Sequence, residues 1–245
     1  MIERKKRRTG KIGIFAVAHA AYGRQFEGFE EKILGYHADL CAKIRKNDID
    51  LTDFGMIDSS EKAYAAIPKI LGADVDVLFC NMTTYATSSV FASIIKAVNK
   101  PVVLAALQPA KCLDYKNACT LMQLENDNIC AVPEFTGVAV RMNRRVNDVI
   151  LGCLYGDEDA DAEIAEWCDI AKVLNSLSGA RLGLMGHVLE SMYDMHADPT
   201  AISNAFGVHV PLLEIDDAAE LFKTVTEEET EKKIEVIKAE FDMPD

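Results

Sequence analysis

A histidine and a tyrosine stand directly after the first strongly apolar run of the chain. Residues 12–18 predict a buried strand, and His19, Tyr22 and Gly23 follow it before the spacing becomes helical. Imidazole and phenol groups can both donate and accept hydrogen bonds. Because open parallel sheets bind ligands beyond the carboxyl ends of their strands, we predict that His19 and Tyr22 contact a ligand. The alternative is a loop histidine that bonds only to the backbone.

Hydroxyl-bearing side chains gather after another expected strand, residues 75–81. Thr83 and Tyr85 belong to this segment, which contains further threonines and serines. Such residues often cap helices, but they also suit a sugar, because each makes directional, neutral hydrogen bonds. Gln108 ends the next expected strand and falls on the same edge of the sheet. Thr83, Tyr85 and Gln108 are therefore further candidates for contact with a polyhydroxylated ligand.

Other kinds of site find little support in the sequence. It contains neither Gly-x-x-x-x-Gly-Lys-Ser/Thr nor Gly-x-Gly-x-x-Gly, so ATP and dinucleotide binding are not predicted. A Gly-x-Ser-x-Gly nucleophile elbow is also missing. His187 and His196 lie nine residues apart, which is no recognised ligand spacing, and we expect His37 and His209 to be structural. We therefore predict no metal site.

The composition is typical of a packed globular protein. Of the 245 residues, 49% are hydrophobic and 27% are charged, unlike a disordered chain. The formal net charge of -13 argues against a nucleic-acid partner, whose phosphates require clustered Lys and Arg. No apolar stretch approaches the roughly 20 residues that span a bilayer, so no membrane partner is expected. The seven cysteines include no Cys-x-x-Cys pair and several lie in apolar runs, which predicts reduced, buried thiols and a cytoplasmic location.

Strand and helix patterns alternate along almost the whole chain. This alternation predicts the α/β class: a doubly wound parallel sheet of flavodoxin-like type, plus the start of a second α/β domain. A small polar segment at residues 175–179 suggests a linker, so we expect an amino-terminal α/β domain over residues 1–178 and an incomplete second domain over residues 179–245. Residues 216–241 predict one long charged helix. The expected strands are residues 12–18, 51–57, 75–81, 101–107, 149–154, 181–185 and 208–215.

Taken in order, these pieces resemble the L-arabinose and L-fucose isomerase family, in particular its amino-terminal half. The resemblance covers nearly all of residues 11–241. Its matching pieces are residues 19–23, residues 77–81 with the loop that follows, residues 99–108, residues 134–142, the helix around Trp167, and residues 181–186 with their loop.

The resemblance implies an isomerase, an intramolecular oxidoreductase of carbohydrate metabolism. Enzymes of this family interconvert an aldose and its ketose with a divalent cation, usually Mn²⁺, while carboxylates move a proton between C1 and C2. The later half of the family's polypeptide supplies the metal-binding and proton-transferring Glu and His residues, and none of them has a match in this sequence. The resemblance therefore implies no catalytic residue and no Mn²⁺ bound by this chain alone, and we expect it to be inactive in isolation.

The resemblance also implies roles at the edge of the active site. In arabinose-type members, the amino-terminal domain reaches the active site of a neighbouring subunit and helps to close over the sugar, which implies a homo-oligomer with a monosaccharide substrate. His19 corresponds to a contact on the substrate side, although the family commonly has Gln there. The region from Thr83 to Tyr85, Gln108, and the loop at Leu189 occupy similar places.

Two other interpretations remain open at this point. The chain could be a sugar-binding or regulatory module without a catalytic half, or an independent enzyme built around His19 and Glu134.

Overall fold

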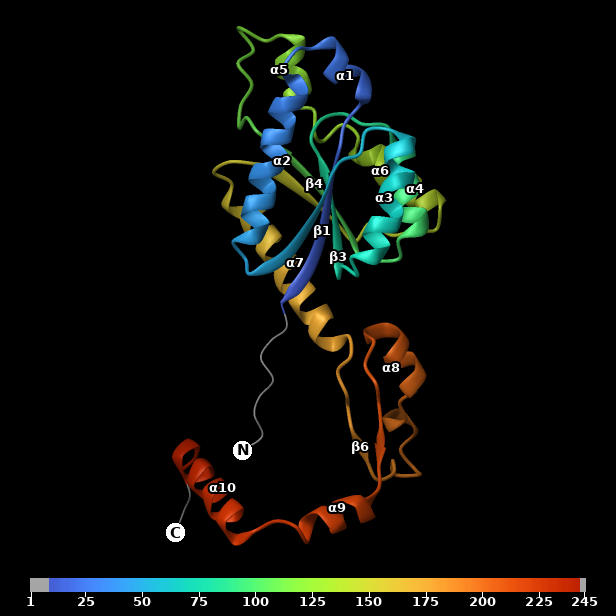
Figure 1. The fold of residues 1–245 in the computed structure, drawn as a ribbon, viewed down its shortest axis with the longest axis vertical. Coiled ribbons are helices and arrows are strands. Elements are labelled where there is room, and N and C mark those ends of the chain that lie inside the picture. Colours follow the sequence, from blue (N-terminus) through green and yellow to red (C-terminus); the bar gives the residue numbers. More distant parts are fainter. Residues whose placement is uncertain (1–8, 243–245) are drawn as a thin grey trace. The chain divides into compact units, whose positions relative to one another are not determined.

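The computed structural model describes residues 9–242 and divides into two compact units (Figure 1). One unit is Arg8–Asn175 and the other contains Ser176–Asp245. The sequence suggested a linker at residues 175–179. Instead, helix α7 (Glu158–Leu177) continues through much of that segment.

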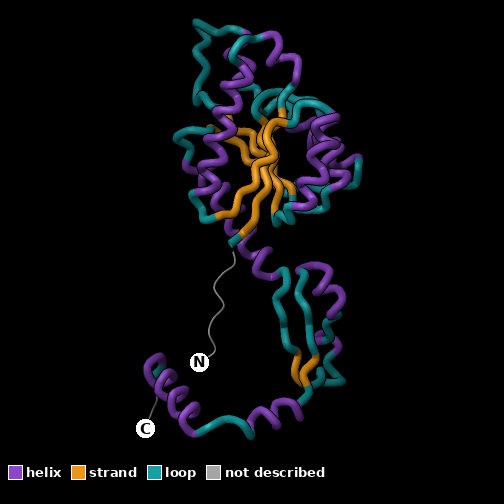
Figure 2. The backbone as a smooth tube through the Cα atoms, viewed as in Figure 1, coloured by secondary structure: helices purple, strands orange, loops and turns teal. Residues whose placement is uncertain are grey.

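A five-stranded parallel sheet forms the centre of the first unit (Figure 2). Its strand order is β2-β1-β3-β4-β5, which is the doubly wound arrangement that the alternating pattern predicts. The central strands are buried on both faces, because their sequences are apolar runs without polar alternation. The strands are β1 (Gly10–Val17), β2 (Ile49–Met56), β3 (Val77–Met82), β4 (Val102–Gln108) and β5 (Asp148–Cys153).

Helices cover both faces of this sheet (Figure 1). Helices α2 (Phe29–Arg45) and α7 pack on one face. The other face is covered by α3 (Ser60–Gly72), α4 (Ser88–Ala97) and α6 (Val132–Arg141). Two short helices, α1 (Ala20–Gln25) and α5 (Thr120–Glu125), lie beyond the carboxyl ends of the strands.

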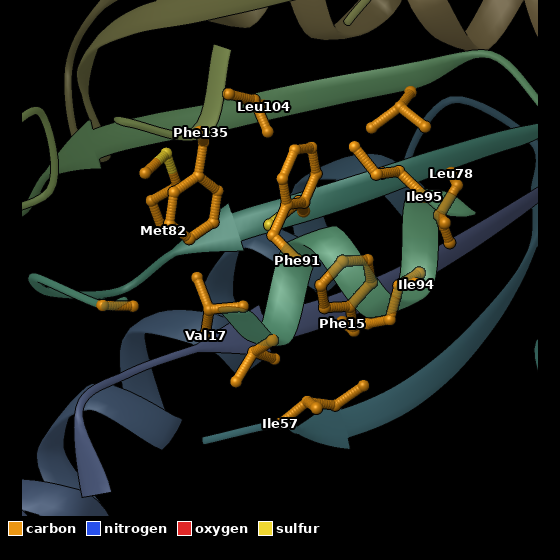
Figure 3. Close-up of a cluster of buried hydrophobic side chains, with 14 of the residues drawn as sticks. Phe15, Val17, Ile57, Leu78, Met82, Phe91, Ile94, Ile95, Leu104 and Phe135 are labelled. Atoms are coloured by element: carbon orange, nitrogen blue, oxygen red, sulfur yellow. The ribbon is translucent and has the colours of Figure 1, made fainter. Parts of the chain in front are cut away.

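Stacked phenylalanines anchor the apolar layer beneath α4 and α6. Phe91 of α4 and Phe135 of α6 are fully buried, and their ring centroids lie 4.8 Å apart at an interplanar angle of 20°. Figure 3 shows both rings packed above β3 and β4, with Phe15 of β1 nearby. This cluster fixes α4 and α6 on the sheet, and with them the loops at the carboxyl ends of the strands.

The second unit buries very little apolar surface. It contains two parallel strands of two residues each, β6 (Leu184–Met185) and β7 (Leu212–Leu213), where longer strands were expected. Within residues 176–242, Val208 is the single buried hydrophobic residue. A two-stranded sheet without a buried face is marginally stable at best. The remaining elements are the 3-10 turn η1 (Tyr193–Met195) and helices α8 (Pro199–Phe206), α9 (Ile215–Phe222) and α10 (Glu227–Glu240).

The long helix expected over residues 216–241 is two helices. Helix α9 ends at Phe222 and α10 begins at Glu227. Thr226 and Glu229 form a capping box at the start of α10, since each side chain bonds to the backbone N–H of the other. This cap gives the second helix its own start.

The expectation that the cysteines are buried is wrong in part. Cys41, Cys80 and Cys168 lie in the core because their segments are apolar faces of strands or helices. The exposed cysteines belong to the polar loops around α5, and they are Cys112, Cys119 and Cys130. None of the helices in the described chain combines the length and apolar character of a membrane span.

Replacing Phe135 by Ala tests the role of the stacked pair. Because the residue is fully buried, Phe135→Ala should lower the free energy of unfolding by about 3–5 kcal/mol, measured by urea denaturation. Tyr115→Ala is the control, since Tyr115 is 84% exposed, and it should change stability by less than about 0.5 kcal/mol. Similar losses in the two variants would contradict the packing described.

Candidate functional site

The strand order places a topological switch point between β1 and β3. After β1 the chain crosses toward β2, whereas after β3 it crosses toward β4 on the other side. The two connections therefore diverge, and this switch point is where open α/β sheets bind ligands. His19 follows β1 and is the N-cap residue of α1, but its side chain makes no capping hydrogen bond. Tyr85 follows β3. We call four residues near this switch point the rim: His19, Tyr22, Tyr85 and Glu134.

Three of the predicted ligand contacts meet at the rim. The ring of His19 lies edge-on to that of Tyr22, with centroids 5.0 Å apart, and edge-on to that of Tyr85 at 6.4 Å. All three residues are partly exposed. The structure thus brings together side chains from α1 and from the loop after β3, with His19 between the two phenols.

The carboxylate of Glu134 completes this group. It lies in the first turn of α6 and accepts a hydrogen bond from the backbone N–H of Ser88 at 2.8 Å, at the start of α4. The Tyr85 hydroxyl donates to its other oxygen at 3.4 Å. Hydrogen bonds from the side chain and backbone of Ser88 lower the pKa of Glu134, and its charge in turn raises the pKa of Tyr85. Glu134 is therefore ionised at neutral pH while the Tyr85 phenol keeps its proton.

Helix α5 and the segment after it are held close to the ends of the strands. The Thr84 hydroxyl donates to the backbone carbonyl of Leu124 at 2.7 Å, and Asn128 Nδ2 donates to the carbonyl of Met82 at 2.7 Å. Asn128 is 3% exposed, and within the described part of the chain its Oδ1 has no hydrogen-bond partner. A buried acceptor of this kind normally bonds to water or a ligand.

Besides partial burial, two side chains that follow α5, those of Asp127 and Cys130, raise the pKa of Tyr22. Partial burial, followed by the charge of Asp127, raises the pKa of Tyr22, so this phenol also stays protonated. Partial burial and a hydrogen bond with Asp127 raise the pKa of Cys130 to about 12. The Cys130 thiol is therefore protonated at neutral pH and is a poor nucleophile.

The hollow beside His19 is too small for a sugar. It is lined by residues that include Gly23, Phe29 and Met56, and it measures about 20 Å³. A space of this size holds about one water molecule. This part of the rim therefore forms a wall rather than an enclosed pocket.

Thr83, Gln108 and Leu189 are the remaining predicted contacts, and no ring contact or hydrogen bond joins them to His19, Tyr22 or Tyr85 within the described residues. Thr83 is 2% exposed, and its hydroxyl donates to the carbonyl of Val17 at 2.8 Å, which ties the loop after β3 to the end of β1. Gln108 ends β4, one strand further along the sheet. Leu189 is 60% exposed and belongs to the second unit.

Asp127, Asn128 and Cys130 were not foreseen from the sequence. They follow a helix rather than a strand, so the rule about carboxyl ends does not find them. The only local signal for them is that the polar residues Asp127 and Asn128 stand just after a short helix, and such residues are common in loops.

Replacing Glu134 by Gln tests the charge at the rim. The pKa of Glu134 is depressed in the folded state, so its ionised form stabilises the protein above the unfolded-state pKa, and this contribution disappears as pH falls through the folded-state pKa. Glu134→Gln should therefore be less stable than the parent at neutral pH and equally stable in acid, measured by urea denaturation.

Glu163→Gln is the matched control. Burial raises the pKa of Glu163, so removing its charge should not destabilise the protein at neutral pH. A loss in Glu134→Gln that is independent of pH would contradict the role given to the ionised carboxylate.

Comparisons with protein-family models and with curated proteins found no match for this chain.

Proposed function

We propose that this chain is the amino-terminal portion of a cytoplasmic aldose–ketose isomerase of the L-arabinose and L-fucose isomerase type. Its part in that enzyme is to supply one wall of the sugar pocket and a surface for homo-oligomer formation. The observation that carries the proposal is the meeting of His19, Tyr22, Tyr85 and Glu134 at the β1–β3 switch point.

The electrostatics of the rim favour a neutral ligand. A helix start such as that of α4 can bind a phosphate, but here the Glu134 carboxylate already accepts the Ser88 N–H. The net charge of -13 further disfavours anions. A monosaccharide carries no charge and suits these surroundings better than a sugar phosphate or a nucleotide.

The hydrogen-bonding groups of the rim suit sugar hydroxyls. Each hydroxyl can donate and accept, so it pairs with a protonated phenol as well as with a carboxylate or amide oxygen. Tyr22 and Tyr85 keep their protons at neutral pH.

The rim does not fit the Mn²⁺ of the family. Manganese requires several oxygen or imidazole ligands around one point, whereas both oxygens of Glu134 are engaged by Ser88 and Tyr85. We therefore derive no step of the isomerisation from these residues and assign the reactive centre to the later half of the family's polypeptide.

The exposed apolar surface of the second unit supports the assignment of the reactive centre to further polypeptide. Phe206, Leu212 and Phe222 are all at least 52% exposed, as are other large apolar residues of the unit. A unit of this kind gains stability by packing against further polypeptide or a neighbouring subunit.

Sugar binding tests the role of His19. Calorimetric titration with L-arabinose and with L-fucose should detect weak binding, and His19→Ala should weaken it about tenfold, the value expected for one lost hydrogen bond. The control is His209→Ala, an exposed histidine of the second unit, which should bind as the parent does. Equal affinity of both variants, or preferred binding of inorganic phosphate, would contradict the proposal.

Incubation with Mn²⁺ tests where the reactive centre lies. The purified chain should form no ketose from L-arabinose or L-fucose above a control without protein, because the rim lacks a fitting metal site. Ketose formation would refute the assignment of catalysis to other polypeptide, while sugar binding would still be judged by the titration.

A further inference from the structure

Three metal-ligating groups converge on the face of the sheet covered by α2. His37 and Cys41 lie one turn apart on α2, so their side chains share one face of the helix. Asp53 reaches them from the neighbouring strand β2. His37 Nε2 lies 3.0 Å from Asp53 Oδ1 and 3.7 Å from Cys41 Sγ, and all three ligand atoms fall within 4.8 Å of one another.

We propose that His37, Cys41 and Asp53 bind a zinc ion. Ligand atoms at the corners of a tetrahedron around Zn²⁺, with bonds of about 2.0–2.3 Å, lie roughly 3.3–3.7 Å from one another. Two of the separations here are already close to this range, so small side-chain rotations complete the site. A thiolate with an imidazole and a carboxylate selects zinc over Mg²⁺, Ca²⁺ or Mn²⁺, which prefer oxygen ligands.

The surroundings hold two of the ligands in place. The backbone N–H of Gly55 donates to Asp53 Oδ1 at 2.8 Å and orients this carboxylate. The buried amide of Asn81 lies 3.0 Å from His37 Nδ1. Such outer contacts orient metal ligands and are typical of zinc sites.

Zinc binding releases one proton. The Cys41 thiol gives up its proton to solvent as the Zn–S bond forms, because the ligand at a zinc site is the thiolate. Without metal, His37 Nε2–H donates to Asp53. With metal on Nε2, that proton resides on Nδ1, where the amide oxygen of Asn81 accepts it after the amide turns over.

The site is accessible from one side. The side chain of His37 is 4% exposed, whereas that of Asp53 is 37% exposed. An ion can therefore enter past Asp53, and water can fill the fourth position. Bound zinc would join α2 to β2 and stabilise the packing of that helix, separately from the sugar-binding rim.

Cobalt is the direct probe of this site. Co²⁺ added to the chelator-treated protein should give a thiolate-to-cobalt charge-transfer absorption that saturates at one equivalent and is abolished by excess Zn²⁺. Cys41→Ser should remove this absorption, and Asp53→Asn should weaken cobalt binding at least about tenfold. Cys168→Ser is the matched control, because Cys168 is also a buried helix cysteine of the same apolar layer.

No charge-transfer absorption in the parent protein, or an undiminished one in Cys41→Ser, would overturn the zinc site. If Cys41→Ser does not fold, Asp53→Asn decides, since Asp53 is partly exposed. Zn²⁺ should then raise the unfolding temperature of the parent and of Cys168→Ser but not of Asp53→Asn, and equal rises would refute the proposal.

Discussion

Burial of β1 and β3 on both faces is the constraint on which the site depends. Strands of this kind need helices on each side of the sheet, so the chain must leave these two neighbours in opposite directions. The two connections diverge at the carboxyl ends of the strands, where the ring of His19 lies near that of Tyr85. His19 and Tyr85 are thus neighbours because of strand order. They follow strands whose paired residues, such as Ile12 and Val77, are 65 positions apart in the sequence.

The charge of Glu134 then limits what the rim can bind. The carboxylate of Glu134 bonds to the first N–H of α4, a position that would otherwise attract an anion. The same charge keeps the proton on Tyr85, so the rim presents neutral donors beside a fixed acceptor. The hollow beside His19 has room for only about one water molecule. To enclose a sugar, the rim would therefore need other polypeptide opposite it.

The sequence was most informative where burial alone decides structure. The apolar strands and their alternation with helices predicted the doubly wound sheet, and the rule about carboxyl ends placed His19 and Tyr85 beyond β1 and β3, where the structure has them. It overestimated Thr83, because only the tertiary structure shows its hydroxyl bonded to the end of β1. Asn128 bonds to the carbonyl of Met82 at the end of β3 through packing of the segment after α5, which no local pattern encodes. The long strands expected near β6 and β7 fail because their apolar side chains lack a face to pack against.

We propose that a neutral sugar lies against the β1–β3 switch point. Backbone amide shifts of the ¹⁵N-labelled chain, followed by NMR during titration with L-arabinose or L-fucose, test it directly. The largest changes are expected at His19, Tyr85 and Ser88, with little change around Cys168 on the far helix. Unchanged signals at these three residues, together with saturable changes elsewhere in the chain, would show that the sugar does not bind at the switch point.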